Sequence, residues 1–409
     1  MDFDMLGLAP KIVARLKEQG ITDPTPIQTQ AIPHAMNGRD VMGLAQTGTG
    51  KTAAFGLPLI HALVTEGTKP APKTARGLIL APTRELANQI AENLRSYVGG
   101  SHLSVAIVVG GVSINRQIGR LERGVDLLVA TPGRLIDLIE RRAVRLDETR
   151  FLVLDEADQM LDMGFIHALR RIAPLLAPER QTMLFSATMP KLMAEIAASY
   201  LTDPVRVEVS RPGKAADNVA QEVHFVAKEG KQELLIEHLS SHKADRALVF
   251  ARTKHGAERL MKQLDRAGFD TASIHGNKSQ GQRDRAIEGF KSGAIKTLVA
   301  TDVAARGIDI PEVEFVYNYD LPNVAENYVH RIGRTARAGR SGRALAFCAP
   351  DEMAYLRDIE KVLKSKLEVG SGAPWAEAAP SSAKPGKGKP GARRRPQRRR
   401  SGGRVKKAA

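Results

Sequence analysis

The sequence contains a single cysteine, Cys348, among 409 residues. One cysteine forms no internal disulfide and supplies no cysteine-based zinc site, and it fits a reducing, cytoplasmic setting. Aromatic residues make up only 4% of the chain, which leaves little material for binding nucleic acid by base stacking. No run approaches the roughly 18 apolar residues of a membrane helix, and residues 1–10 lack the basic start of a secretion signal. We therefore expect a protein that is neither exported nor membrane-spanning.

Positive charge is abundant, but it is concentrated at one end of the chain. Lys and Arg number 61 against 45 Asp and Glu, which gives a formal net charge of +16. Residues 370–409 carry +11 of this excess, so residues 1–369 carry only +5. Hydrophobic residues make up 43%, enough for two or three domains of about 150 residues with real cores. A positive field attracts polyanions such as nucleic acid, but the sign of the charge alone names no partner.

Short apolar runs alternate with helical patterns through the first half of the chain. Runs of this length, flanked by turn residues, are typical of strands buried on both faces of a parallel sheet. Helical patterns such as residues 84–97 and 134–141 lie between them, which indicates repeated β-α-β units. The predicted strands are residues 40–42, 78–80, 105–109, 127–129, 151–154 and 182–185.

A second α/β set follows a polar segment with Pro and Gly, residues 210–218, which we interpret as a linker. After Leu367 the composition changes to Gly, Pro, Ser, Ala, Lys and Arg, which bury too little apolar surface to fold alone. The sequence thus predicts two α/β domains with parallel sheets, residues 1–209 and 219–367, and a disordered basic tail, residues 368–409. The predicted strands of the second domain are residues 222–226, 247–250, 271–274, 297–299, 315–317 and 344–347.

The strongest local motif lies between the first predicted strand and a helical pattern. Its glycines allow backbone N–H groups to wrap phosphates, Lys51 neutralises phosphate charge, and the Thr52 hydroxyl can bind Mg²⁺. Alanine stands at the first glycine position, but the strand-to-helix context still predicts a phosphate-binding loop. The motif comprises Ala45, Gln46, Thr47, Gly48, Thr49, Gly50, Lys51 and Thr52.

Acidic residues follow the predicted strand at residues 151–154. In open α/β sheets this end of a strand faces the ligand, so one carboxylate of the pair Asp155 and Glu156 can hold Mg²⁺ while its neighbour activates water. Taken singly, such acids are also typical of a helix N-cap. The phosphate-binding loop upstream in the same domain favours the catalytic interpretation.

Asp155-Glu156-Ala157-Asp158 spells the signature of the DEAD-box RNA helicases, which this chain resembles. Other motifs of that family follow in order over residues 1 to about 367, roughly nine tenths of the chain. The resemblance implies two tandem RecA-like domains, ATP and Mg²⁺ as cofactors, and RNA as the partner. Residues 3–8 and 186–190 look most similar to the bacterial RhlE-like branch.

The resemblance identifies residues 1–29 as the family's adenine-reading segment. Gln28 would hydrogen-bond the base edge, with Thr25 beside it and Phe3 as the upstream aromatic residue. A carboxamide offers both a donor and an acceptor, which suits adenine better than guanine. Without the family, this Pro-rich stretch would be interpreted as a helix start.

Several short motifs resemble the family's RNA-contacting segments. They combine turn or small polar residues with arginines that meet sugar and phosphate, which implies RNA binding largely independent of sequence. Without the family, they would be ordinary strand-to-helix loops, and residues 282–285 would be a solvated helix face. The candidates are Pro82, Thr83, Arg84, Gly110, Gly111, Thr131, Pro132, Gly133 and Arg134 in the first domain, and Arg252, Gln282, Arg285, Thr301 and Asp302 in the second.

Ser186 and Thr188 follow the last predicted strand of the first domain. They resemble the motif that couples hydrolysis to strand separation. The resemblance adds Asp158 and His330 to this coupling group. The two hydroxyls are equally typical of a helix N-cap.

The end of the second domain is expected to complete the ATP site. By resemblance, Gly307 and Asp309 contact ATP, and Arg334 and Arg337 reach the γ-phosphate, with Arg337 as the arginine finger. Ala336 stands where the family usually has glycine, which we interpret as a modest packing change. Three further arginines are interpreted as solvated: Arg331, Arg340 and Arg343.

The sequence predicts an ATP-dependent RNA helicase that separates short duplexes locally, with Lys51, Asp155, Glu156 and the two arginines as catalytic residues. An ATP-gated RNA clamp or annealing scaffold is an alternative, as is a DNA helicase, because contact with sugar and phosphate does not identify the sugar. The tail is expected to anchor RNA non-specifically, or to act only as a solubility appendage.

Overall fold

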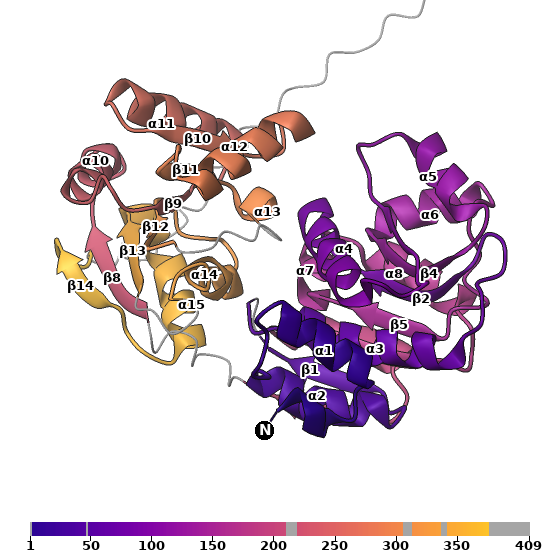
Figure 1. Ribbon diagram of the computed structural model, residues 1–409. Helices are drawn as coiled ribbons and strands as arrows, with labels where there is room; N and C mark the ends of the chain where they lie inside the picture. The colour runs from indigo at the N-terminus through magenta and orange to yellow at the C-terminus, as the bar shows by residue number, and fades with distance from the viewer. Residues whose placement is uncertain (1, 46–47, 210–218, 306–312, 337–341, 376–409) are drawn as a thin grey trace, which may run out of the picture. The chain divides into compact units, whose positions relative to one another are not determined.

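The computed structural model describes residues 2–45, 48–209, 219–305, 313–336 and 342–375, which form two parallel sheets with helices (Figure 1). No helix in these ranges is long and apolar enough to cross a membrane. Some predictions fall outside the described residues: the linker, most of the tail, and Gln46, Thr47, Gly307, Asp309, Arg337 and Arg340.

The first sheet has seven parallel strands in the order β3-β4-β2-β5-β6-β1-β7. Its inner strands are mostly apolar, and β2 and β4 are buried along all six residues, as expected for a sheet covered on both faces. The strands are β1 (Val41–Leu44), β2 (Ala75–Leu80), β3 (Val105–Val108), β4 (Val125–Ala130), β5 (Phe151–Leu154), β6 (Gln181–Ser186) and β7 (Val205–Glu208).

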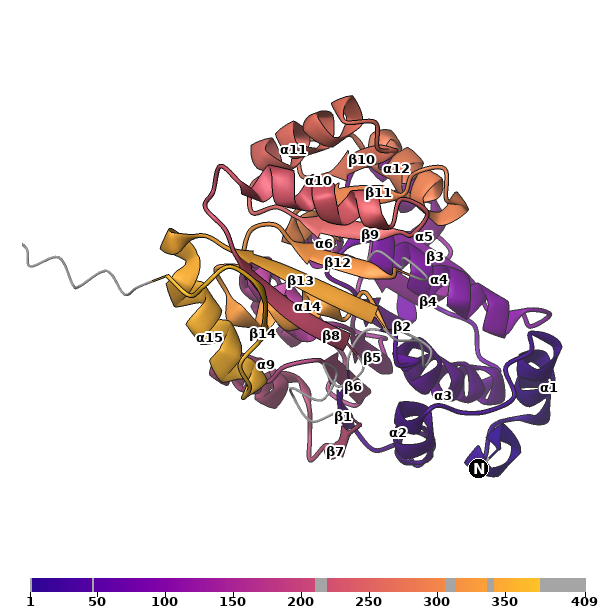
Figure 2. The same cartoon turned by 90° about the vertical axis from the view of Figure 1, so that its left-hand side faces the viewer.

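The second sheet repeats this strand order, β10-β11-β9-β12-β13-β8-β14, again with parallel pairs throughout (Figure 2). Each strand therefore has a counterpart in the first sheet, and residues at the ends of counterpart strands occupy equivalent places. The strands are β8 (Val219–Phe225), β9 (Ala247–Phe250), β10 (Thr271–Ile274), β11 (Thr297–Ala300), β12 (Phe315–Asn318), β13 (Gly342–Cys348) and β14 (Glu368–Ser371).

Helices connect the strands, and several begin with a side-chain cap. Thr83 before α4 accepts a hydrogen bond from the Leu86 N–H, and Thr253 before α11 accepts one from Gly256, at counterpart strand ends. Helix α3 packs between α2 and α4, and α14 packs against α15. The helices with the first sheet are α1 (Pro10–Glu18), α2 (Pro26–Met36), α3 (Lys51–Glu66), α4 (Arg84–Val98), α5 (Ile114–Leu121), α6 (Pro132–Glu140), α7 (Ala157–Asp162), α8 (Ile166–Ile172) and α9 (Lys191–Tyr200). Those with the second are α10 (Lys231–Ser241), α11 (Lys254–Arg266), α12 (Gln280–Ser292), α13 (Asp302–Ala305), α14 (Ala325–Ile332) and α15 (Met353–Leu363); Phe3–Leu6, Ala173–Leu175 and Pro350–Glu352 are short 3-10 turns.

The two α/β halves confirm the predicted fold class, but each sheet has an edge strand that the apolar runs did not predict. Strand β7 alternates valine with exposed charged residues, and β14 is exposed along its whole length. Both escape a search for continuous apolar runs because an edge strand buries fewer side chains. Since Val369 of β14 pairs with Val223 of β8, the predicted boundary at Leu367 falls before the last strand of the sheet.

Three histidines gather where β8 meets α10 in the second half. The rings of His224 and His238 contact edge to face at 4.8 Å, and His242 stacks on Phe315 at 3.9 Å. Burial lowers the pKa of all three. Arg343 adds to the lowering, whereas the nearby acids Glu222, Glu237 and Asp245 oppose it.

This cluster predicts a pH-dependent loss of stability. Because folding lowers the pKa of these histidines, the unfolded chain binds more protons once the pH falls below about 6.5. The stability they contribute is complete above that pH and is lost as the pH falls. The urea midpoint should therefore drop between about pH 7.5 and 5.5, and drop less in His238→Gln. His255→Gln, an exposed histidine on α11, is the control; equal drops in both variants would contradict the prediction.

Candidate functional site

The predicted phosphate-binding loop joins β1 to α3. Gly48 and Gly50 have φ of +88° and +90°, a region that glycine adopts without strain. A Cβ on Gly50 would lie 2.5 Å from Nε2 of Gln28, so no larger residue fits there. Gln28 donates from Nε2 to the Gly50 carbonyl (3.0 Å), and its Oε1 accepts from the Thr25 N–H (2.9 Å). The predicted adenine reader therefore holds the loop directly.

Phe3, the predicted aromatic contact to adenine, is only 1% exposed and belongs to the hydrophobic core of the first half. Its contact with a base stays a prediction. Thr49 and Thr52 are partly exposed, the latter at the second position of α3.

Lys51 and Asp155 meet inside the protein. They are 5% and 2% exposed, and Nζ of Lys51 lies 3.5 Å from Oδ1 of Asp155. Within the described part of the chain, this Nζ has no hydrogen-bond partner. Burial alone would lower the pKa of Lys51, but the carboxylates of Asp155, Glu156 and Asp158 outweigh it and raise that pKa. A buried ammonium that stays charged and unsatisfied fits an anionic ligand such as a triphosphate.

The carboxylates are placed by the end of β5. Glu156 is 2% exposed and has φ +52°, a left-handed conformation that costs a non-glycine residue about 1–3 kcal/mol. Its N–H donates to Asp155 Oδ1 (3.0 Å). Burial, opposed by Lys51 and assisted by Glu156, raises the pKa of Asp155 to about 6. A carboxylate and a hydroxyl are oxygen ligands that suit Mg²⁺, so Asp155 and Thr52 fit the predicted metal.

The other three predicted coupling residues come together around Asp158. Its Oδ2 accepts from the Thr188 N–H (2.9 Å), the Thr188 hydroxyl (2.9 Å) and the Ala187 N–H (3.1 Å). Ser186 donates its hydroxyl to the Thr188 carbonyl (2.6 Å), and Nε2 of His330 lies 3.9 Å from Asp158. Helix α9 begins at Lys191, so the alternative that these hydroxyls cap a helix is wrong.

The predicted RNA residues of the first half also converge. Gly111 has φ +77°, a conformation that favours glycine, and a Cβ there would lie 1.7 Å from Nη1 of Arg84, so a larger residue would displace that guanidinium. Arg134 donates to the Val112 carbonyl (3.1 Å). Pro82 and Thr83 precede α4, and Thr131, Pro132 and Gly133 begin α6.

Strand order explains how one sheet edge holds both groups. The residues around Lys51, Asp155 and Ser186 follow β1, β5 and β6, which are neighbours. The RNA candidates follow β2, β3 and β4, the neighbouring strands at the other end of the order. Since all seven strands are parallel, their carboxyl ends lie along one edge, with the predicted nucleotide residues on one part of it and the predicted RNA residues on the other.

In the second half, Arg252 follows β9 and Thr301 follows β11, the counterparts of β2 and β4. Arg252 contacts Glu352 and donates to the Leu321 carbonyl (3.2 Å). Gln282 and Arg285 are exposed on α12. Their neighbour Arg283 does not fit the alternative of a solvated helix face, because its guanidinium forms an ion pair with Glu85 at 2.9 Å.

The prediction that Arg331 is solvated is wrong, because this residue is only 1% exposed. It forms two bonds to Asp302, at 2.6 and 2.8 Å, and donates to Asn318 (3.1 Å). The carboxylate of Asp302, a predicted RNA contact, is thus engaged by a buried arginine. Arg343 is half-exposed as expected and pairs with Glu222. Arg334 is 4% exposed and lines a small pocket with His330.

Ala336 is constrained by its backbone rather than by packing. Its φ is +53°, a conformation that costs an L-residue about 1–2 kcal/mol.

We expect Ala336→Gly to stabilise the second half by about 0.5–1 kcal/mol, because relief of this cost outweighs the added chain entropy of glycine. Urea unfolding measures the change. Ala267→Gly, an exposed alanine with φ −83°, should lose stability and serves as the control. A loss of stability in both variants would contradict the backbone explanation.

The sequence patterns did not predict the buried ion pair between Lys231 and Glu352. Lys231 opens α10 after Gly230 and β8, as Lys51 opens α3 after Gly50 and β1. It is 1% exposed, and its Nζ donates to Glu352 (2.5 Å) and to the Tyr319 carbonyl (2.7 Å). The signal was available as a Gly-Lys pair at a strand-to-helix turn. Here a carboxylate of the protein itself satisfies the lysine.

Comparisons with known proteins identify the family of both halves. Residues 25–196 match the DEAD/DEAH box helicase family and residues 230–339 match the helicase conserved C-terminal domain. The chain is 43% identical to the ATP-dependent RNA helicase CshA of Listeria monocytogenes over 376 residues, covering 92% of this chain and 71% of that protein. It is also 43% identical to CshA of Bacillus cereus over 368 residues, 90% of this chain and 69% of the relative.

Solved structures share the fold of both halves. S. cerevisiae Dbp5 bound to RNA and ADP BeF3 superimposes with a TM-score of 0.78 at 31% identity, over 90% of this chain and 95% of the other. Mss116p bound to ssRNA and AMP-PNP gives a TM-score of 0.82 at 27% identity, over 91% and 79%. Both halves of the chain thus have counterparts in proteins solved with RNA and a nucleotide.

Proposed function

This chain belongs to the DEAD-box family of ATP-dependent RNA helicases, and on that premise we propose how its residues divide the work. ATP binds at the nucleotide part of the first sheet edge, with Lys51 on the phosphates and Gln28, Thr25 and Phe3 at the base. The observation that carries this assignment is the buried, unsatisfied Nζ of Lys51 at 3.5 Å from Asp155. Gly307 and Asp309 complete the site.

Hydrolysis is proposed to use Glu156 as the residue that takes a proton from the attacking water. Asp155 and Thr52 would hold Mg²⁺, which neutralises phosphate charge when bound. Arg334 and Arg337 stabilise the charge that spreads over the γ-phosphate; an arginine in this role contributes roughly 10³–10⁵ in rate.

RNA is proposed to bind along its sugar-phosphate backbone at the RNA part of each sheet edge, largely independent of sequence. Asp158 links the two ligands, because its carboxylate holds the turn at Thr188 and lies near His330. ATP and RNA then favour the same arrangement of the two domains, and loss of the γ-phosphate releases it.

The test compares ATPase stimulation by RNA and by DNA of the same sequence, together with the unwinding of a short RNA duplex. We expect strong stimulation by RNA only, and unwinding that requires ATP. Equal stimulation by DNA would contradict the RNA assignment and support a DNA helicase. Retention of ATP-independent strand annealing without unwinding would instead support the annealing scaffold.

The proposed domains are residues 1–209 and 219–375, joined by a linker at residues 210–218. The basic tail that follows them is proposed as a non-specific RNA anchor. A truncation after Trp375 tests it without removing β14, which pairs with β8. If annealing is lost and unwinding persists, annealing belongs to the tail. If neither RNA affinity nor its salt dependence changes, the tail is only a solubility appendage.

The assignment to a branch within the family rests on fewer residues than the assignment to the family. Residues 3–8 and 186–190 suggested an RhlE-like protein. The 43% identity to CshA proteins supports a CshA-like assignment instead.

A further inference from the structure

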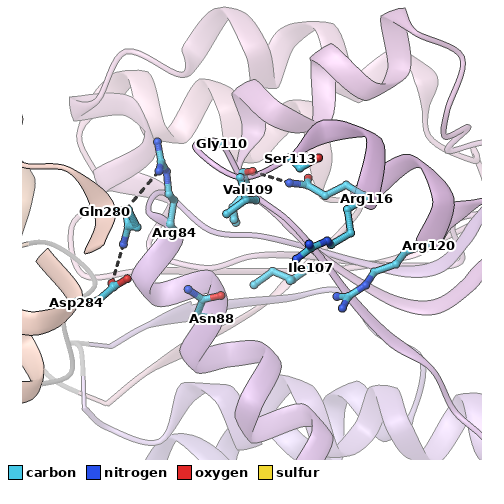
Figure 3. A pocket seen from close by; sticks show the side chains of 12 residues that line it. Arg84, Asn88, Ile107, Val109, Gly110, Ser113, Arg116, Arg120, Gln280 and Asp284 are labelled. Atoms are coloured by element: carbon cyan, nitrogen blue, oxygen red, sulfur yellow. Dashed lines mark hydrogen bonds between the residues drawn. The ribbon is translucent and has the colours of Figure 1, made fainter. Parts of the chain in front are cut away.

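A pocket lies beside the RNA candidates of the first half, among α4, β3 and α5 (Figure 3). Ile107 and Val109 supply an apolar floor, and three guanidinium groups line it, from Arg84, Arg116 and Arg120. Among the described residues that line it, Asp284 of α12 is the single acid. The lining therefore combines apolar surface with an excess of positive charge.

Arg116 and Arg120 have no structural role visible in the fold. Both are exposed, and they lie four positions apart on α5, so their side chains share one face of the helix. No acidic residue lies within α5, and neither arginine has an ion-pair partner in the described ranges. Like charges at this spacing repel, and a polyanion on this face would relieve that repulsion.

The pocket is continuous with the predicted RNA path and is held rigidly against it. Gly110 lines the pocket, and Gln117 donates to the Val109 carbonyl (3.0 Å), which fixes α5 to the end of β3. Arg84 donates to Gln280 (3.3 Å), whose own amide donates to Asp284 (2.9 Å). Asp284 thus accepts a hydrogen bond from Gln280, as Figure 3 shows, and within the described residues it forms no ion pair with Arg116 or Arg120.

We propose that this pocket is an additional subsite for single-stranded RNA, where the strand leaves Gly110 and Gly111. Arg116 and Arg120 bind two successive phosphates, because guanidinium groups match phosphate oxygens in geometry and charge. The apolar floor receives a base or ribose. This inference rests on the proposed RNA binding and extends it by one site on α5.

The test measures how RNA affinity depends on salt for the double variant Arg116→Ala/Arg120→Ala, with a single strand of about 12 nucleotides. Each phosphate that the protein no longer neutralises lowers the log–log slope by about 0.7, so two lower it by about 1.4. The change in Kd between about 50 and 200 mM salt then shrinks roughly sevenfold. The ATPase rate at saturating RNA stays unchanged, because neither arginine touches the nucleotide.

The matched control is Arg259→Ala/Arg266→Ala, two exposed arginines on α11 of the second half. An unchanged slope in the α5 variant, or an equal change in the α11 control, would overturn the subsite. A wild-type protein that RNA does not stimulate would instead refute the proposed function, so the two failures are distinguishable.

Discussion

Glu156→Gln should reduce RNA-stimulated ATP hydrolysis by about 10²–10⁴ while leaving ATP binding intact. The amide keeps the size of the side chain and its place at the end of β5, but it cannot accept a proton from water. Steady-state ATPase assays measure the rate, and a fluorescent ATP analogue measures binding. Lys51→Ala should behave differently and weaken nucleotide binding itself, because it removes the buried ammonium beside Asp155.

The control for this pair is Glu179→Gln, an exposed glutamate of the first half, which should retain full activity. Near wild-type hydrolysis by Glu156→Gln would remove the proposed base. Tight ATP binding by Lys51→Ala would show that the loop does not use this lysine for phosphate.

Arg331→Ala should destabilise the second half by about 3–5 kcal/mol, the cost of breaking a buried ion pair by removing one partner. Arg331 is 1% exposed, bonds Asp302 through two nitrogens and covers the ring of Phe250 at 4.9 Å. Its loss leaves the carboxylate of Asp302 and the amide of Asn318 without this partner. Urea unfolding, followed by a probe in the second half, measures the change in free energy of unfolding.

Arg343→Ala supplies the matched control. Its side chain is 51% exposed and pairs with Glu222, so its loss should cost only about 0.2–1 kcal/mol. Equal effects of the two substitutions would contradict the buried role of Arg331. If Arg331→Ala proves too unstable to purify, Asp302→Asn, which weakens the same pair from the other side, should show a smaller loss in the same direction.

Much of the fold followed from local pattern. Buried strands such as β5 and β9 are continuous apolar runs, and their ends place Asp155 and Arg252 at the ligand edge by a general rule of parallel sheets. The phosphate loop was predictable because glycine, lysine and threonine are needed there in a fixed order. These features are local, so a sequence displays them without any tertiary contact.

Other features depend on contacts between distant segments. The burial of Arg331 requires Asp302, 29 residues earlier, and no periodicity signals that pairing. The partner of Lys231 is Glu352, 121 residues away. Edge strands β7 and β14 have too little apolar surface to be predicted from apolar runs. The left-handed backbone conformation of Ala336 is a property of the folded chain that its residue type does not indicate.

In the proposed function, one sheet edge carries two coupled sites, one for ATP and one for RNA. Coupling of this kind is reciprocal: a non-hydrolysable ATP analogue must tighten RNA binding by the same factor by which RNA tightens binding of the analogue. Measuring both Kd values with and without the other ligand tests this directly. The two-site account predicts equal enhancements of about 5–150-fold, and loss of both in Asp158→Asn. Independent binding of the two ligands to the wild-type protein would contradict it.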